Sequence, residues 1–156
     1  ESADELALGE ALDALLRQLA LEIVHDGEGA RRVGRIVVTG RPEAVEPVAR
    51  SIANSPLVKT ALHGGDPNFG RILQAAGQAW PRGEPFVADL EIEGRQLVSA
   101  GDAIGLSLED LRSLGELVQG SEIEYALTLP GEGGEAEVFF SDLSTAYVAY
   151  NAEYTS

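Results

Sequence analysis

The stretch Val33-Gly34-Arg35-Ile36-Val37-Val38-Thr39 is rich in β-branched side chains, which favour an extended strand. Ahead of it, apolar residues recur at steps of three and four, the spacing of one helix face; they are Leu8, Leu12, Leu15, Leu19 and Ile23. We therefore expect a helix that ends near Gly27, followed by the strand. Residues 42–53 should form a second helix with Pro47 in its first turn, because a proline further inside would remove a hydrogen bond.

Shorter elements are expected downstream. Residues 57–62 are predicted to form a short strand. Asp66 as N-cap and Pro67 at the first helical position should then begin a third helix. Apolar and polar residues alternate over 86–92, which predicts a half-buried strand with a hairpin partner around Leu97.

The last third of the chain is predicted to hold one helix and one β-hairpin. Ser107 and Asp110 form the capping-box pattern of a helix start. Beyond that helix, 123–129 alternates as a strand, and 136–140 is expected to pair back onto it across a glycine-rich turn.

The order of these elements indicates the fold class. Helices and strands alternate early and strands pair locally later, so we predict an α+β fold with helices packed on mixed sheets. The length of 156 residues indicates one domain over 1–156, with a sub-boundary near 80–86.

Charge and composition restrict the partners. Asp and Glu total 26 against 11 Lys and Arg, and the formal net charge of −15 repels phosphate, so neither nucleic acid nor a membrane surface is expected as a partner. The absence of cysteine excludes a disulfide framework and a cysteine nucleophile. No metal or organic cofactor is expected, because the carboxylates do not group at ligand spacing. No apolar run approaches the roughly 18 residues of a membrane span. The absence of cysteine leaves the compartment undetermined, and the reducing cytoplasm is the default expectation.

Two glycine-rich segments are candidates for function. In 26–30, Glu28 lies between two glycines at a helix end, where its carboxylate can project into a cleft and bind an ammonium group; a plain turn explains the pattern equally well. In 64–71, glycines followed by a helix N-terminus could receive an anion, and a glycine turn before a capped helix is the alternative. The second segment matches neither the P-loop nor the dinucleotide fingerprint.

His25 and His63 are the only histidines. A catalytic triad of a histidine with Asp66 and a serine can be drawn, but nothing in the spacing requires it. Surface and capping roles are the commoner outcome for two histidines in a chain of this size.

Four ordered segments together resemble one family. They are Asp26–Ala30, Ile52–Ala61, Gly65–Arg71 and the C-terminal residues Asp142-Leu143, Tyr147-Val148 and Asn151–Tyr154. These segments look like the C-terminal part of the β chain of ornithine acetyltransferase, also called glutamate N-acetyltransferase. The stretch 54–61, Asn-Ser-Pro-Leu-Val-Lys-Thr-Ala, is close to the family signature.

The resemblance implies an N-terminal-nucleophile-like enzyme made from a self-cleaving precursor. In that family the precursor splits into α and β chains, which form a heterotetramer, and the new N-terminal threonine of β is the nucleophile. This threonine carries an acetyl group from N-acetylornithine to glutamate in arginine biosynthesis, and the bifunctional form also uses acetyl-CoA. The present sequence has no such threonine-led segment. The expected partners are therefore the α chain, which supplies the oxyanion hole, and the N-terminal part of β, and the isolated chain is expected to be inactive.

The same resemblance assigns three substrate-binding residues. Glu28 matches a substrate-contacting glutamate, Asn151 matches an asparagine near the family's C-terminus, and Ser156 stands where the family has a threonine. A carboxylate such as Glu28 can bind an ammonium group of the substrate, whereas amide and hydroxyl groups can bind its carboxylate. Further departures are Phe69 in place of a tryptophan and Ser144 in place of a common threonine.

Two structural expectations follow from the missing partner and the aromatic tail. Apolar surface should be exposed on the helix over 8–23, where the partner would lie. Tyr147, Val148 and Tyr154 should pack onto the body of the domain and so hold the C-terminal site residues; a final element that only completes the core is the alternative.

Two other functions stay open on the sequence. One is a non-catalytic amino-acid-binding or assembly domain of the same fold, since the nucleophile is missing from the sequence. The other is an unrelated anion-binding protein built on residues 64–71.

Overall fold

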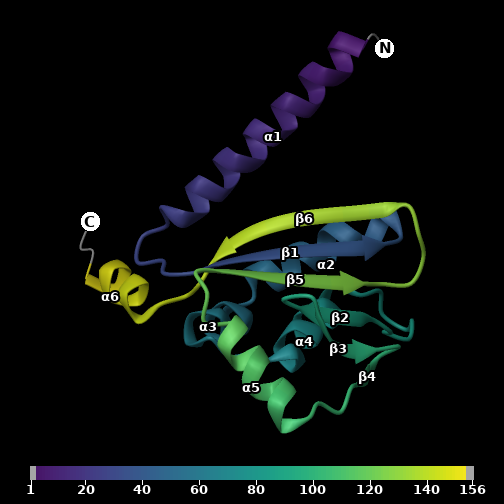
Figure 1. Cartoon of the computed structure of the whole chain (residues 1–156), viewed down its shortest axis with the longest axis vertical. Helices are drawn as coiled ribbons and strands as arrows, with labels where there is room; N and C mark the ends of the chain where they lie inside the picture. The colour runs from purple at the N-terminus through teal and green to yellow at the C-terminus, as the bar shows by residue number, and fades with distance from the viewer. Residues whose placement is uncertain (1–2, 154–156) are drawn as a thin grey trace.

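The computed structural model describes residues 3–153. Its elements, in chain order, are α1 (Ala3–His25), β1 (Val33–Gly40), α2 (Pro42–Asn54), α3 (Pro56–Gly64), α4 (Phe69–Ala79), β2 (Asp89–Ile92), β3 (Arg95–Ser99), β4 (Asp102–Ala103), α5 (Leu108–Leu117), β5 (Glu122–Thr128), β6 (Gly134–Ser141) and α6 (Thr145–Glu153). The predicted α+β class is confirmed: the strands form one mixed sheet on which helices pack (Figure 1).

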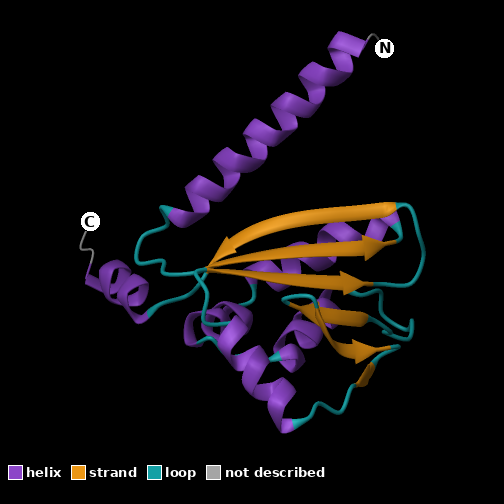
Figure 2. Cartoon of the chain, in the orientation of Figure 1, coloured by secondary structure: helices purple, strands orange, loops and turns teal. Residues whose placement is uncertain are grey.

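The sheet has six strands in the order β4-β3-β2-β5-β1-β6 (Figure 2). β1 runs parallel to β5, with Val33 opposite Glu122, and antiparallel to β6, with Val33 opposite Ser141. β2 and β3 form the hairpin expected around Leu97. Strands on both sides of 80–86 join this sheet, and the sub-boundary there stays a prediction.

The expected hairpin between 123–129 and 136–140 is wrong. Both strands exist, but β1 lies between them and pairs with each. The connection after β5 crosses the end of β1, where the Leu129 N–H donates to the Thr39 carbonyl at 2.8 Å. The glycine-rich connection is long enough to cross the end of a strand, so β1 can insert between β5 and β6 and pair with both.

One face of the sheet carries the hydrophobic core. α2 and α4 cover this face, with α3 and α5 beside them (Figure 1). The alternation of β1 puts Ile36 and Val38 on the covered side, against Val48 and Ile52 of α2. The segments of the candidate site emerge from the ends of these strands and helices.

The strand predicted over 57–62 is the helix α3. Its start is signalled by Ser55, whose Oγ accepts the Val58 N–H at 3.4 Å, and by Pro56 in the first turn. A short apolar run with β-branched residues does not by itself distinguish strand from helix, so this start signal should have decided the assignment.

Two smaller expectations about helix geometry are also wrong. α4 begins at Phe69 with Asn68 as its N-cap, and not with Asp66, because the Asp66 N–H still bonds to Ala61 at the end of α3. Pro47 lies inside α2, since Pro42 already occupies the first turn.

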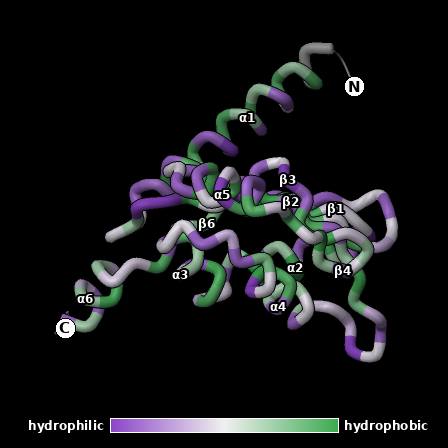
Figure 3. The backbone as a smooth tube through the Cα atoms, turned by 60° about the horizontal axis from the view of Figure 1, so that its bottom comes forward, coloured by the Kyte–Doolittle hydropathy of each residue, from purple (hydrophilic) through white to green (hydrophobic). Residues whose placement is uncertain are grey.

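Helix α1 stands clear of the domain over most of its length (Figure 1). Hydrophobic segments recur along this projecting helix (Figure 3). Its large apolar side chains, between 44% and 73% exposed, form what we call the leucine stripe: Leu8, Leu12, Leu15, Leu16, Leu19 and Ile23. The expected exposed apolar surface is confirmed. Within residues 3–153, none of the helices combines the length and the apolar character that a membrane crossing requires.

The expected packing of the C-terminal aromatic residues is wrong for the part described. α6 buries none of its residues, and Tyr147 and Val148 are exposed. Tyr154 lies outside the described residues. The connection of α6 to the domain is polar instead, through the residues that immediately precede it.

Candidate functional site

The segment that carries Glu28 is a tight loop between α1 and β1, which we call the acid loop (residues 26–32). Gly29 adopts a left-handed conformation with φ of 70°. A Cβ atom there would lie 2.8 Å from the Tyr147 nitrogen and 3.1 Å from Ser144 Oγ, so only glycine allows this approach. Glu28 itself is exposed at the turn. The acid loop and α6 lie at the same end of the sheet (Figure 1).

Asp142 ties the acid loop to the chain just before α6. Its Oδ1 accepts the N–H groups of Arg31 and Arg32 at 2.8 and 3.2 Å, and its Oδ2 lies 2.6 Å from His63 Nδ1. The Asp142 side chain is fully buried, and these partners satisfy a carboxylate that would otherwise be costly to bury. The residue therefore fixes three segments at one point.

Ser144 makes a second connection. Its hydroxyl donates to the Gly29 carbonyl at 2.7 Å and accepts the Tyr147 N–H at 3.0 Å. Asn151 follows one turn after Tyr147 on α6 and donates to the Tyr147 carbonyl at 2.9 Å. The structure thus brings together the elements that carry Glu28 and Asn151, whereas Ser156 lies outside the described residues.

Two small hollows flank this junction. One, of about 300 Å³, is lined by residues that include Lys59, Asp142 and Tyr147. The other, of about 240 Å³, is lined by Thr60, Ser144 and their neighbours. Both are open at the surface.

The segment 64–71 makes several contacts within the chain. Gly65 is left-handed, with φ of 61°, and a Cβ there would lie 2.5 Å from the Arg32 guanidinium and 2.6 Å from the Gln119 amide. Asn68 caps α4, and Arg71 donates to the Leu57 carbonyl at 3.0 Å. The space beside Gly65 is therefore occupied by the chain's own side chains, which favours a turn at this glycine over an anion site.

The histidines have partners distant in sequence. His63 pairs with Asp142 and not with Asp66, and His25 Nε2 lies 3.0 Å from Glu122. Sequence reasoning missed the His63–Asp142 and Ser144–Gly29 contacts. Asp142 belonged to a segment of the family resemblance, but no pattern among neighbouring residues indicated its hydrogen-bond partners. Among the residues described, no cluster of three His, Asp or Glu side chains is arranged to hold a metal ion.

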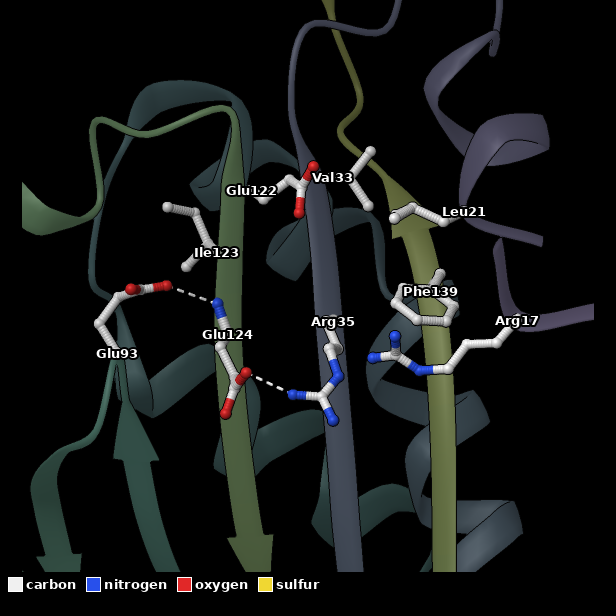
Figure 4. Close-up of a pocket in the computed structure, with 9 residues that line it drawn as sticks. All are labelled: Arg17, Leu21, Val33, Arg35, Glu93, Glu122, Ile123, Glu124 and Phe139. Carbon is white, nitrogen blue, oxygen red and sulfur yellow. Dashed lines mark hydrogen bonds and ion pairs between the residues drawn. The ribbon is translucent and has the colours of Figure 1, made fainter. Parts of the chain in front are cut away.

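A further hollow lies on the face of the sheet that α2 and α4 do not cover, beneath the C-terminal half of α1 (Figure 4). Arg17 of α1 forms two 2.9 Å hydrogen bonds to Glu137, and its guanidinium lies 5.2 Å from the centre of the Phe139 ring. Arg35 bonds to both Glu137 and Glu124. Each arginine already has carboxylate partners, and the Arg17–Glu137 hydrogen bonds hold α1 against the sheet. The hollow is therefore a poor site for an anionic ligand.

The contacts of Glu137 with Arg17 and Arg35, which hold α1 on the sheet, are expected to be sensitive to acid. Hydrogen bonds, first from Arg17 and then from Arg35, hold the pKa of Glu137 below its usual value of about 4.5. The ionic contacts are therefore complete above that value and are lost as the pH falls through the lowered pKa of the folded state.

Glu137→Gln should loosen α1 even at pH 7, measured as faster hydrogen exchange or a longer spin-label distance between α1 and β6. Glu135→Gln, an exposed acid on the same strand, is the control. An unchanged distance in Glu137→Gln would show that α1 is held otherwise.

The fold and the site define a class of protein. It is an α+β domain in which a glutamate-bearing loop from one end of the chain is hydrogen-bonded to the segment that leads into the C-terminal helix. The chain belongs to the ArgJ family, whose model matches residues 1–156. The resemblance drawn from the four sequence segments is confirmed.

Individual relatives agree with this assignment. The arginine biosynthesis bifunctional protein ArgJ of Rhodopirellula baltica is 39% identical over 159 residues, covering 99% of this chain and 38% of that protein. The protein of the same name from Desulfotalea psychrophila is 42% identical over 148 residues, covering 94% of this chain and 37% of the relative. The chain thus spans about two fifths of the length of these curated relatives.

A solved structure is also similar. The crystal structure of the arginine biosynthesis bifunctional protein ArgJ from Bacillus halodurans superposes with a TM-score of 0.87 at 29% sequence identity. The match covers 98% of this chain and 72% of that one. The predicted fold class, including its N-terminal-nucleophile-like character, is confirmed by this likeness.

Proposed function

We propose that this chain is part of an acetyltransferase of arginine biosynthesis that moves an acetyl group from N-acetylornithine to glutamate, with acetyl-CoA as a further donor if the protein is bifunctional. Its relatives carry the name arginine biosynthesis bifunctional protein. The observation in the fold that carries the proposal is the junction at Ser144. It joins the acid loop to α6, so that Glu28 and Asn151 come from connected elements although they are far apart in sequence.

In the proposed reaction a threonine outside this chain is the nucleophile. Its hydroxyl attacks the acetyl carbonyl, the α-amine of ornithine leaves with a proton, and an acetyl-threonine ester remains. The α-amine of glutamate then attacks the ester, and the threonine hydroxyl is regenerated. The present chain supplies binding groups: Glu28 for an ammonium group of the substrate, and Asn151 with Ser156 for its α-carboxylate.

The exposed surface of α1 supports a missing partner. Arg17 and Leu21, one helical turn apart, face the chain's own sheet (Figure 4). At 3.6 residues per turn the leucine stripe lies on the other side of the helix, directed away from the sheet. Six large apolar side chains exposed on one face are more than a free surface normally carries. We propose that the remainder of an ArgJ-type polypeptide, the α chain and the N-terminal part of β, covers this stripe.

Substitution of Asn151 in the complete protein tests the proposed binding role. Asn151→Ala should raise KM for both N-acetylornithine and glutamate, because both carry the α-carboxylate. A hydrogen bond to a charged group contributes roughly 1.5–3 kcal/mol, equivalent to about a ten- to hundredfold change. Glu153→Ala, exposed on the same helix, is the control and should leave both constants unchanged. A domain without an amino-acid site would show no difference between the two variants.

A further inference from the structure

We infer that Ser144 is a positioning residue of the proposed substrate site, holding the acid loop and α6 in one fixed geometry through its hydroxyl group. This inference rests on the proposed function, but its structural half can be tested without any activity. Ser144 does not project into solvent, since it is only 2% exposed. It therefore acts through the residues that it holds.

The hydroxyl of Ser144 acts both as a hydrogen-bond donor and as a hydrogen-bond acceptor. As a donor it bonds to the Gly29 carbonyl at 2.7 Å, and as an acceptor it receives the Tyr147 N–H at 3.0 Å. One side chain thus joins the residue directly after Glu28 to the first turn of the helix that carries Asn151. Removing the hydroxyl leaves a partly buried carbonyl and a helix N–H without this partner.

The acid loop is held at a second point by Asp142. That carboxylate receives the N–H groups of Arg31 and Arg32, so the C-terminal half of the loop is fixed independently of Ser144. Loss of the Ser144 hydroxyl should therefore release the turn at Glu28 and Gly29 and leave the rest of the loop in place. The expected effect is local and not a general unfolding.

α6 depends strongly on the same hydroxyl. This helix buries none of its residues, so hydrophobic packing contributes little to its position. Its start is held by Ser144, through the hydroxyl to Tyr147 and through the carbonyl, which accepts the Val148 N–H at 3.4 Å. A helix anchored in this way takes its orientation from its first turn, and Asn151 lies one turn further on.

The environment of Ser144 provides a matched control. The residue borders the hollow of about 240 Å³ that Thr60, Thr145 and Val148 also line. We expect this hollow to accommodate the methyl group that threonine adds at Cβ. Ser144→Thr should keep both hydrogen bonds, although it changes the side-chain volume more than alanine does. Ser144→Ala removes both hydrogen bonds with a smaller change in volume.

The first experiment measures hydrogen exchange in the complete protein. Ser144→Ala should speed exchange at Tyr147 and in α6, while the amides of Arg31 and Arg32 stay protected by Asp142. Ser144→Thr should exchange like the unmodified protein. Wild-type exchange in Ser144→Ala, or equal loosening in both variants, would overturn the inference.

The second experiment separates positioning from mere structural support. A binding group displaced by about 1 Å can cost up to about 100-fold in rate, so Ser144→Ala should lower kcat/KM roughly 10- to 100-fold, mainly through KM, while Ser144→Thr stays near the wild type. Combined with Glu28→Gln, the loss should be much smaller than the product of the single losses, because both changes disable the same contact. Multiplicative losses would overturn the inference. Altered exchange with unaltered kinetics in all variants would show instead that the junction exists and the proposed function is wrong.

Discussion

Glu28→Gln in the complete protein is expected to lower kcat/KM for acetyl transfer by roughly 30-fold to several thousand-fold. The change keeps the shape of the side chain and removes the charge that would bind the ammonium group. Loss of one partner of a charge pair in a closed site costs about 2–5 kcal/mol, part of it because the other charge is left unpaired. Folding should be unaffected, since Glu28 is exposed at a turn.

Steady-state kinetics with N-acetylornithine and glutamate measure this effect. Asp26→Asn is a matched control, because Asp26 is an exposed acid in the same loop. The melting temperatures of both variants should equal that of the wild type. If Glu28→Gln has the KM and kcat of the wild type, Glu28 serves only the turn, which was the alternative that the sequence left open.

The second large effect is all-or-none: the 156-residue chain alone should transfer no acetyl group, and co-expression with the remainder of an ArgJ-type polypeptide should restore activity. The physical reason is that the proposed nucleophile and oxyanion hole lie in that remainder. Turnover by the isolated chain, measured as acetylglutamate formed, would refute this expectation.

The leucine stripe should be the surface on which the remainder assembles. Leu12→Glu and Leu19→Glu place charges on the stripe and should abolish co-purification, because a carboxylate cannot be buried there without a partner. Ala14→Glu adds the same charge on the side of the helix that carries Leu21, where it is exposed, and should leave assembly intact. Co-purification of the stripe variants at wild-type yield would place the partner elsewhere.

Local signals in the sequence predicted several elements well. The capping box of Ser107 and Asp110 is present at the start of α5, because both of its hydrogen bonds join residues only three apart. α1 and β1 follow their patterns for the same reason, since helical and strand periodicity are properties of neighbouring residues. α3 shows the limit, because its apolar run was too short to reveal its period.

The candidate site was predictable in part. Glu28 and Asn151 could be named from a resemblance, which says nothing about how the elements that carry them are connected. The contacts that join their segments, Asp142 to Arg31 and Ser144 to Gly29, link residues 111 and 115 positions apart. No periodic pattern or local motif encodes pairs at such separations.

The sequence by itself determined the α+β class, the acidic charge, most helices and strands, and the family, since each depends on composition or on residues close together in the chain. Only the tertiary structure decided that β1 separates β5 from β6, that the leucine stripe of α1 faces away from its own sheet, and that a buried serine and aspartate connect the acid loop to α6. These features depend on which apolar faces pack together in space. Once packing has placed the segments, buried polar groups must find partners there, whatever their distance along the chain.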